Sequence, residues 1–587
     1  MLKFLSIFLT KKNCDLNLPN NSIFVQTQKI QTKIIFIMNK PKLLLIAGLI
    51  TFSGINMKAQ KAGPYVVKSS EEFESPKRHE IMDPVPYGKD GIIQVNAKKS
   101  ESFSFQLFSN DLKFIKENTV NTETKLNEHT SYDRFFKFKN KTYLFVRDVN
   151  KEAHTEGISA LEFSPKDLDF TGSSKGLFQS SDKVRTLGGS GVSALGYFYV
   201  KGYTGAYTFD VSNDATKFLY SYSLVPKEKK DKLNKDIIGL YAFDENLNKL
   251  WGGEYEMPYT EAIMDNLGYT IADDGKVYLL AKVFENDDRK AATKDGVPNY
   301  HFEILIYQKD SKTPKSVEIK IDNYFPKEAY IYEGDNHNIV IAGFYGKAAN
   351  KPVDGAYMVK LDVEKATVSK VNGGYFEIPS EIIKAFTSER EKRKLEKKED
   401  KDAEGDIGVD NLRIRDIYEM PNGSTKIVSE QYWVRRITYY DNSCHCMKTK
   451  YDTYADDIFV MSIDAKGKLE WVKKIPKAQH SSDAIGDGLS INSMITGNDL
   501  HIFYIDNIKN LNLPATEAPK VHQNRMGGFL TAVTVNEKGD VKKFSLGQIN
   551  DFDTNFFIRG FEDGGNNNII STERKKKMNK LFSIEVK

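Results

Sequence analysis

Cys444, His445 and Cys446 are the residues whose types come nearest to a metal site in this chain. Two thiolates and an imidazole suit Zn²⁺, but a zinc site needs a fourth ligand and usually a wider spacing. On a strand the two cysteines would share one face, and the histidine would point away from it. We therefore predict no metal site and keep these three residues only as the metal candidates. The two cysteines are expected to form a disulfide or to remain as buried thiols.

Aromatic side chains crowd the same stretch, residues 433–457, which reads WVRRITYYDNSCHCMKTKYDTYADD. Exposed aromatic rings can stack on a sugar or on a peptide. The alternative is that they pack an extended hairpin against the rest of its own sheet. We expect a binding site here, formed by Trp433, Tyr439, Tyr440, Tyr451 and Tyr454.

The compact catalytic motifs are absent from the sequence. It holds no HExxH, Walker loop or GxGxxG, and GGSGVSALG around Ser190 does not fit a GxSxG elbow. A carboxylate pair for glycoside cleavage stays open, because 80 Asp and Glu residues give no basis for choosing one pair. No catalytic residue is assigned, and no cofactor is predicted.

These candidates lie among elements that repeat along the chain. Residues 458–475 read IFVMSIDAKGKLEWVKKI, with apolar positions alternating on both sides of the turn at 464–467. This pattern predicts two half-buried strands joined as a hairpin. The same separation of Asp from Trp recurs at Asp244 and Trp251.

A second kind of hairpin carries an Asp/Gly or Asn turn followed by a strongly apolar strand. Seven copies are found, with turns near residues 140, 213, 273, 334, 422, 498 and 564. Such repeats predict an all-β fold, a β-propeller of about seven four-stranded blades, with six or eight left open. An early hairpin near residue 103 and a last strand over 581–586 predict that both chain ends share one blade.

The D-x2-G-x3-W pattern at 464–471 resembles the blade hairpins of quinoprotein-type propellers. It is also similar to a family of uncharacterised secreted β-propellers of Gram-negative bacteria. The resemblance implies the fold and leaves the function open. Quinone chemistry is not required to explain the pattern, because Asp or Gly makes the turn and Trp packs between blades.

Long connections indicate which face of the propeller could bind. Hairpin turns fall on one face and the connections on the other, so the irregular sequence gathers on one face. Binding residues are expected there, and the alternative is that long loops merely tolerate insertion. The long connections span residues 178–205, 225–236, 285–300, 376–410, 433–457 and 506–527.

The 376–410 connection is predicted to hold a charged helix. Ser380 can cap it, and Ile382, Ile383 and Phe386 form a short apolar stripe. The following SEREKRKLEKKEDKDAEGD is nearly pure charge. We expect a solvated helix that continues into a mobile linker; the alternative is a docking arm for a partner.

The N-terminal segment predicts export. Residues 38–59 resemble a bacterial Sec signal peptide, with lysines before an apolar run over 43–52 and Ala59 at a cleavage point. Residues 1–37 are expected to be upstream sequence translated by mistake. No later stretch has eighteen consecutive apolar residues, so the mature chain is predicted to have no transmembrane segment.

A net charge of +4 with scattered basic residues argues against a nucleic-acid partner. Residues 60–100 are expected to be an N-terminal extension and residues 101–587 the propeller, with 376–410 and 433–457 as insertions. The expected function is non-catalytic binding or scaffolding in the cell envelope, with an envelope protein or glycan as partner. The alternative is an extracellular enzyme acting on glycan at the mouth of the central channel. The expected location is periplasmic, outer-membrane-associated or extracellular.

Overall fold

The computed structural model describes residues 60–587 apart from gaps at residues 99–100, 124, 127–129, 187–205, 228–232, 288, 290–292, 295–296, 320, 322–323, 335–336, 400–406, 483–488, 524–526, 555 and 576. These residues belong to one compact unit, Met57–Lys587. The expected mistranslated segment, 1–37, and the expected signal peptide, 38–59, lie outside the described residues.

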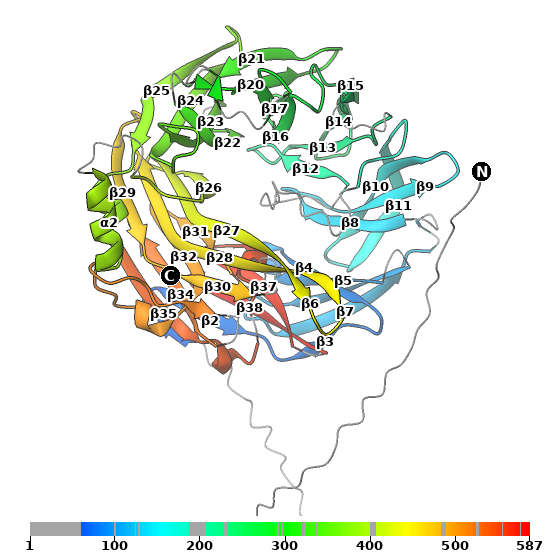
Figure 1. The fold of residues 1–587 in the computed structure, drawn as a ribbon. Helices are drawn as coiled ribbons and strands as arrows, with labels where there is room; N and C mark the ends of the chain where they lie inside the picture. The colour runs from blue at the N-terminus through cyan, green and yellow to red at the C-terminus, as the bar shows by residue number, and fades with distance from the viewer. Residues whose placement is uncertain are drawn as a thin grey trace, which may run out of the picture. The chain divides into compact units, whose positions relative to one another are not determined.

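Eight sheets of four or six strands follow one another along the described part of the chain, and we call them blades 1 to 8 (Figure 1). In blades 1 to 7 the four strands pair in chain order. Blade 1 consists of β4 (Glu80–Pro86), β5 (Ile92–Lys98), β6 (Ser102–Phe108) and β7 (Phe114–Asn121), and blade 2 of β8 (Thr130–Lys137), β9 (Thr142–Asn150), β10 (Thr155–Ser164) and β11 (Asp169–Gln179). Blade 3 consists of β12 (Thr208–Val211), β13 (Lys217–Ser223), β14 (Ile237–Asp244) and β15 (Lys249–Glu256), and blade 4 of β16 (Met264–Ile271), β17 (Val277–Phe284), β20 (Tyr300–Tyr307) and β21 (Lys315–Ile319).

Blades 5 to 7 repeat the same order. Blade 5 consists of β22 (Phe325–Glu333), β23 (Ile339–Gly346), β24 (Gly355–Asp362) and β25 (Thr367–Glu377). Blade 6 consists of β26 (Leu412–Glu419), β27 (Thr425–Asp441), β28 (Cys446–Ile463) and β29 (Leu469–Ile475). Blade 7 consists of β31 (Asn492–Thr496), β32 (Asp499–Asp506), β34 (Phe529–Val535) and β35 (Val541–Gln548). Shorter strands lie in the connections: β18 (Thr293–Lys294), β19 (Val297–Pro298), β30 (Gln479–Ser482) and β33 (His522–Gln523).

Blade 8 is formed by both ends of the described chain. The C-terminal part supplies β36 (Glu562–Gly565), β37 (Asn568–Lys575) and β38 (Met578–Val586), and the N-terminal part supplies β1 (Gln60–Ala62), β2 (Tyr65–Ser69) and β3 (Phe73–Glu74). Strand β2 pairs with β38, from Tyr65 opposite Val586 to Ser69 opposite Phe582. Both chain ends share one blade, as predicted, but the hairpin near residue 103 is not the N-terminal contribution: it forms β6 and β7 of blade 1, and β1 to β3 complete blade 8 instead.

An apolar cluster lies at each interface between successive blades. Between blades 1 and 2, for example, the rings of Phe105 and Phe163 have centroids 4.5 Å apart. Equivalent clusters follow at every further interface up to blades 7 and 8. The cluster of Ile92, Phe108, Leu112, Ile570 and Leu581 then joins blade 8 back to blade 1. The sheets therefore form a closed ring, and the chain is an all-β propeller.

The blade count is eight, one of the alternatives that the turns left open. The additional blade is blade 1, because residues 60–100, which we expected to be an N-terminal extension, form β1 to β5 instead. Strand β4 carries Pro84 and Pro86, and proline argues against a strand because it lacks the N–H that a ladder needs. Here β4 is the end strand of its sheet and has a bulge between Ile81 and Pro84, so both prolines are tolerated.

The D-x2-G-x3-W turns do what the sequence predicted. Asp464 Oδ1 accepts hydrogen bonds from the amides of Lys466 (2.9 Å) and Lys468 (2.7 Å), and Gly467 takes a φ of 81°. Trp471 then donates from Nε1 to the carbonyl of Glu537 in blade 7, at 3.1 Å. The tryptophan therefore ties its blade to the next one.

Short turns and long connections lie on opposite faces of the propeller. Short turns join the first strand to the second and the third to the fourth, and every long connection joins the second strand to the third or one blade to the next. Because neighbouring strands are antiparallel, the two sets emerge at opposite ends of the blades. We call these ends the turn face and the connection face.

The 376–410 connection contains two helices, α1 (Ser380–Lys384) and α2 (Glu389–Glu399). Ser380 is the first residue of α1 and does not cap it. The serine cap belongs to α2, where the amide of Glu391 donates to Ser388 Oγ and the amide of Ser388 donates to Glu391 Oε2, both at 3.3 Å. Ile383 of α1 is buried, and Lys474 of β29 donates to the carbonyl of Ala385 at 2.8 Å, so the insertion packs on the outer strand of blade 6. Neither described helix has the length and apolar content of a bilayer span.

Candidate functional site

Strands β27 and β28 continue beyond the body of blade 6 as a two-stranded ribbon. They pair from Thr425 opposite Ile463 to Asp441 opposite Cys446. Figure 1 shows the pair as long yellow arrows that extend past β26 and β29. The 433–457 connection, expected to be an insertion, is therefore regular β structure. We call residues 432–455 the ribbon.

Three aromatic rings stack across the base of the ribbon on neighbouring strands. The ring of Trp433 (β27) lies 4.8 Å from that of Tyr454 (β28), with an angle of 6° between the planes. The ring of Tyr454 lies 4.5 Å from that of His480 (β30), at 19°. These residues are directly opposite one another in the strand register, and each is half-buried. We call Trp433, Tyr454 and His480 the aromatic ladder.

The remaining predicted aromatic residues lie farther along the ribbon. Because side chains alternate between the faces of a strand, Tyr439 shares the face of the ladder. Tyr440 and Tyr451 lie on the opposite face, where Tyr440 stands opposite Met447. Tyr439 and Tyr440 are exposed, and Tyr451 is half-buried. Of the five predicted binding residues, the structure stacks only Trp433 and Tyr454 together.

The metal candidates lie at the exposed tip of the ribbon. Cys444 and Cys446 form a disulfide, so neither offers a thiolate to a metal. His445 takes a φ of 50°, and its Nδ1 lies 3.5 Å from Tyr440 Oη. Of the two alternatives expected for these cysteines, a disulfide or buried thiols, the structure forms the disulfide.

A buried ionic network holds the base of the ribbon. Glu430 and Lys477 are both fully buried, with Lys477 Nζ 2.7 Å from Glu430 Oε1. Glu430 Oε2 accepts hydrogen bonds from Arg415 Nε (2.8 Å) and Ser490 Oγ (2.5 Å). Lys477 also donates to Gln479 Oε1 at 3.0 Å, which ties the network to β30. The charged groups therefore link β26, β27 and the strand that carries His480.

The pKa values of two buried glutamates, Glu430 and Glu328, are shifted in opposite directions. Burial alone would raise the pKa of Glu430, but the charges of Lys477 and Arg415 outweigh it and lower the pKa to about 2. Burial raises the pKa of Glu328, on β22, to about 7, although the charge of Arg413 opposes it. At neutral pH Glu430 is therefore ionised, whereas Glu328 is partly protonated.

Sequence reasoning did not find His480 or Lys477. His480 lies on a four-residue strand, β30, that pairs with β28 after the rest of blade 6 is complete. Its sequence, QHSS, has no apolar alternation. Of the three ladder residues, only Trp433 and Tyr454 could be predicted from the sequence, because they are aromatic residues in a long connection.

No family model and no curated protein matches this chain. Among solved structures it is similar to a protein of unknown function from Dyadobacter fermentans, with 10% identity, a TM-score of 0.30, and coverage of 78% of this chain and 96% of that one. It is also similar to the β-propeller domain of the Trilobed protease from Pyrococcus furiosus, with 11% identity, a TM-score of 0.31, and coverage of 82% and 98%. For prolyl oligopeptidase B from Galerina marginata the values are 8%, 0.35, 87% and 56%. The assignment of the fold rests on the strand pairings.

Proposed function

We propose that this protein is a non-catalytic binding propeller of the cell envelope whose ribbon holds a glycan. The observation that carries the proposal is the aromatic ladder of Trp433, Tyr454 and His480, with both ring pairs nearly parallel. Rings stacked at these distances cover each other's inner faces, so a sugar ring would stack on an outer face of the row, that of Trp433 or of His480. An envelope protein is the other partner class, and the experiment below separates the two.

Rigidity of the ladder supports the same role. A binding surface gains affinity when its side chains are ordered before the ligand arrives. The ladder is fixed by the pairing of three strands and by the buried Glu430–Lys477 pair beneath them. Charged side chains beside it can add hydrogen bonds to hydroxyl groups: Arg435 stands two residues from Trp433 on the same face.

Calorimetric titration with a panel of envelope polysaccharides and oligosaccharides tests the proposal. The double variant Trp433→Ala/Tyr454→Ala should lose at least tenfold in affinity for the glycan that binds. Thr438→Ala/Thr449→Ala, an exposed pair on the opposite face of the ribbon, is the matched control and should bind like the wild type.

Two results would contradict the proposal. One is a glycan that binds equally well to the ladder variant and to the wild type. The other is a panel without any binder while the purified wild-type chain, but not the ladder variant, retains one defined envelope protein. The second result would assign the ladder to a protein partner.

A second candidate is an enzyme acting on glycan, and the opposite pKa shifts of Glu328 and Glu430 are the observation that favours it. Both side chains are buried, so catalysis would require them to become accessible to substrate. Glycoside cleavage uses one protonated and one ionised carboxyl group, and the charge of Arg415 acts on both glutamates. A general acid with a pKa of about 7 would make activity fall as pH rises above 7. Reducing-sugar release by the wild type, lost in Glu328→Gln, would support this candidate. Absence of release across the panel would reject it.

Export is part of the proposal. The disulfide of Cys444 and Cys446 suits an oxidising compartment, and residues 38–59 have the composition of a signal peptide. N-terminal sequencing of the protein from fractionated cells should find Gln60 as the first residue, in an envelope or extracellular fraction. A cytoplasmic chain that begins at Met38 or earlier would contradict export.

A further inference from the structure

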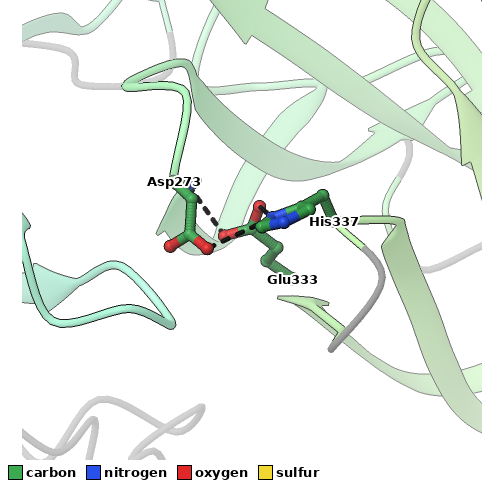
Figure 2. A group of neighbouring side chains, drawn as sticks. All are labelled: Asp273, Glu333 and His337. Carbon is green, nitrogen blue, oxygen red and sulfur yellow. Dashed lines mark hydrogen bonds and ion pairs between the residues drawn. The ribbon is translucent and has the colours of Figure 1, made fainter.

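Asp273, Glu333 and His337 meet at the turn face between blades 4 and 5 (Figure 2). Asp273 lies in the turn after β16, Glu333 ends β22, and His337 lies in the turn that follows. His337 Nδ1 is 3.2 Å from Asp273 Oδ2 and 3.4 Å from Glu333 Oε1. One donor atom from each residue lies within 4.8 Å of the other two. Two oxygens and one nitrogen therefore converge on one point.

Each carboxylate is held by a backbone amide through its other oxygen. Asp273 Oδ1 accepts from the amide of Asp214 at 2.9 Å, and Glu333 Oε2 accepts from the amide of Asp273 at 2.8 Å. The oxygens left over, Oδ2 and Oε1, are the two that face His337. Hydrogen bonds of this kind orient the carboxylates that bind metals and leave one oxygen for the ion. The amides belong to blades 3 and 4, so the arrangement depends on the packing of neighbouring blades.

The two carboxylates lie close together where water reaches them poorly. The side chain of Glu333 is 4% exposed and that of Asp273 is 12% exposed, whereas that of His337 is 70% exposed. Their ligand oxygens lie within 4.8 Å of each other, so the two negative charges repel. A bound cation would remove this repulsion, and it could enter from the exposed histidine side.

His301 shows what an ordinary histidine–carboxylate contact looks like in the same chain. Its Nδ1 lies 3.2 Å from Glu285, and its Nε2 lies 2.9 Å from Glu303. The two carboxylates therefore lie at opposite edges of the ring and share no common point with one nitrogen. At His337 a single nitrogen faces both carboxylates.

We propose that Asp273, Glu333 and His337 bind a divalent transition-metal ion such as Zn²⁺ or Co²⁺. One imidazole nitrogen and two carboxylate oxygens are a donor set that these ions accept, with water in the remaining positions. The ion would join the turns of blades 4 and 5. The site lies on the face opposite the ribbon, so it is independent of the proposed glycan binding.

Titration of the EDTA-treated full chain with Co²⁺ and Zn²⁺ tests the site. The wild type should bind one equivalent of Co²⁺ with a visible absorption band, and Zn²⁺ should displace it. His337→Ala should bind at least tenfold more weakly, and Asp273→Asn likewise. His301→Ala is the matched control and should bind like the wild type. Circular dichroism should show all variants folded, since His337 is exposed.

The competing explanation is a protonated His337 that forms ion pairs with both carboxylates and needs no metal. If the wild-type chain binds neither ion at 1 equivalent or in large excess, the proposal is overturned and the protonated His337 is the better explanation. Binding that is unchanged in both His337→Ala and Asp273→Asn would place any metal elsewhere and would also overturn it. Loss of binding in His301→Ala alone would do the same.

Discussion

Lys477 Nζ lies 2.7 Å from Glu430 Oε1, and both side chains are fully buried. The pair joins β27 to the segment that leads into β30. A fully buried contact between two segments is more often apolar than ionic. Two charges removed from water are stable only when each keeps its partners. The base of the ribbon is therefore sensitive to the loss of one charge.

Lys477→Met should destabilise the protein by about 3–5 kcal/mol, because it leaves Glu430 ionised and buried with less compensation. The double variant Glu430→Gln/Lys477→Met should cost less, since no uncompensated charge remains. Denaturant unfolding of the three chains measures the difference. Lys365→Met, at an exposed ion pair with Asp362, is the control and should unfold like the wild type. Equal losses in the single and double variants would contradict the prediction.

Glu573→Gln should raise stability at pH 8 and leave it unchanged near pH 4. Burial raises the pKa of Glu573 to about 7, above its ordinary value of 4.5, so the folded state holds a proton that the unfolded state has lost between these values. Wild-type stability should therefore fall as pH rises from 4.5 through 7, by on the order of 1–3 kcal/mol from this group. The glutamine oxygen can still accept from Ser571 Oγ and from the amide of Phe557.

Unfolding of both chains at the two pH values checks this. Glu364→Gln, an exposed position, is the control and should give no difference between the two pH values. A stability gain for Glu573→Gln at pH 4 as large as the gain at pH 8 would contradict the assignment.

Tyr65→Phe should weaken the closure of the ring. Tyr65 Oη lies 2.8 Å from His501 Nδ1 and 2.6 Å from Thr534 Oγ1, so the hydroxyl joins the N-terminal strand β2 to blade 7. Its removal leaves buried polar groups without a partner, at a cost of about 1–3 kcal/mol. Thermal unfolding of this variant should show a lower midpoint than that of Tyr440→Phe, whose ring is exposed. Equal midpoints would show that the contact contributes nothing to closure.

Cys444→Ser/Cys446→Ser should leave the unfolding midpoint of the propeller unchanged. The disulfide closes a very short loop at the exposed tip of the ribbon, and the stabilisation expected from a disulfide grows with loop length. Melting curves with and without a reducing agent check the expectation. A drop as large as that of Lys477→Met would mean that the tip contributes to the folded core.

Most of the fold could be predicted from the turn residues, because a turn such as that of Asp464 and Gly467 is formed by contacts with neighbouring backbone. Blade 1 could not be predicted, because Pro84 and Pro86 in its end strand β4 give the same sequence signal as prolines in a loop. Helix signals were partly right: a helix was expected over residues that form α1 and α2, but the serine cap is Ser388 instead of Ser380.

The candidate sites depend on contacts between segments far apart in the chain. Trp433 and Tyr454 could be chosen by type, whereas His480 joins them only through the pairing of β28 with β30. Asp273 and His337 belong to turns that the sequence predicted, yet nothing local shows that neighbouring blades bring them together. Residue types and turn patterns report short-range structure; the register between blades is set by packing.

Strand β38 pairs with β37 on one side and with β2 and β3 on the other. During synthesis β2 and β3 therefore lack their partner strand until β38 has been made, and the ring cannot close before then. A premature stop codon that removed only β38 would leave β2 and β37 with unpaired edges at the gap. Such edges are templates for aggregation, so the loss of β38 alone should be as damaging as the loss of an entire blade.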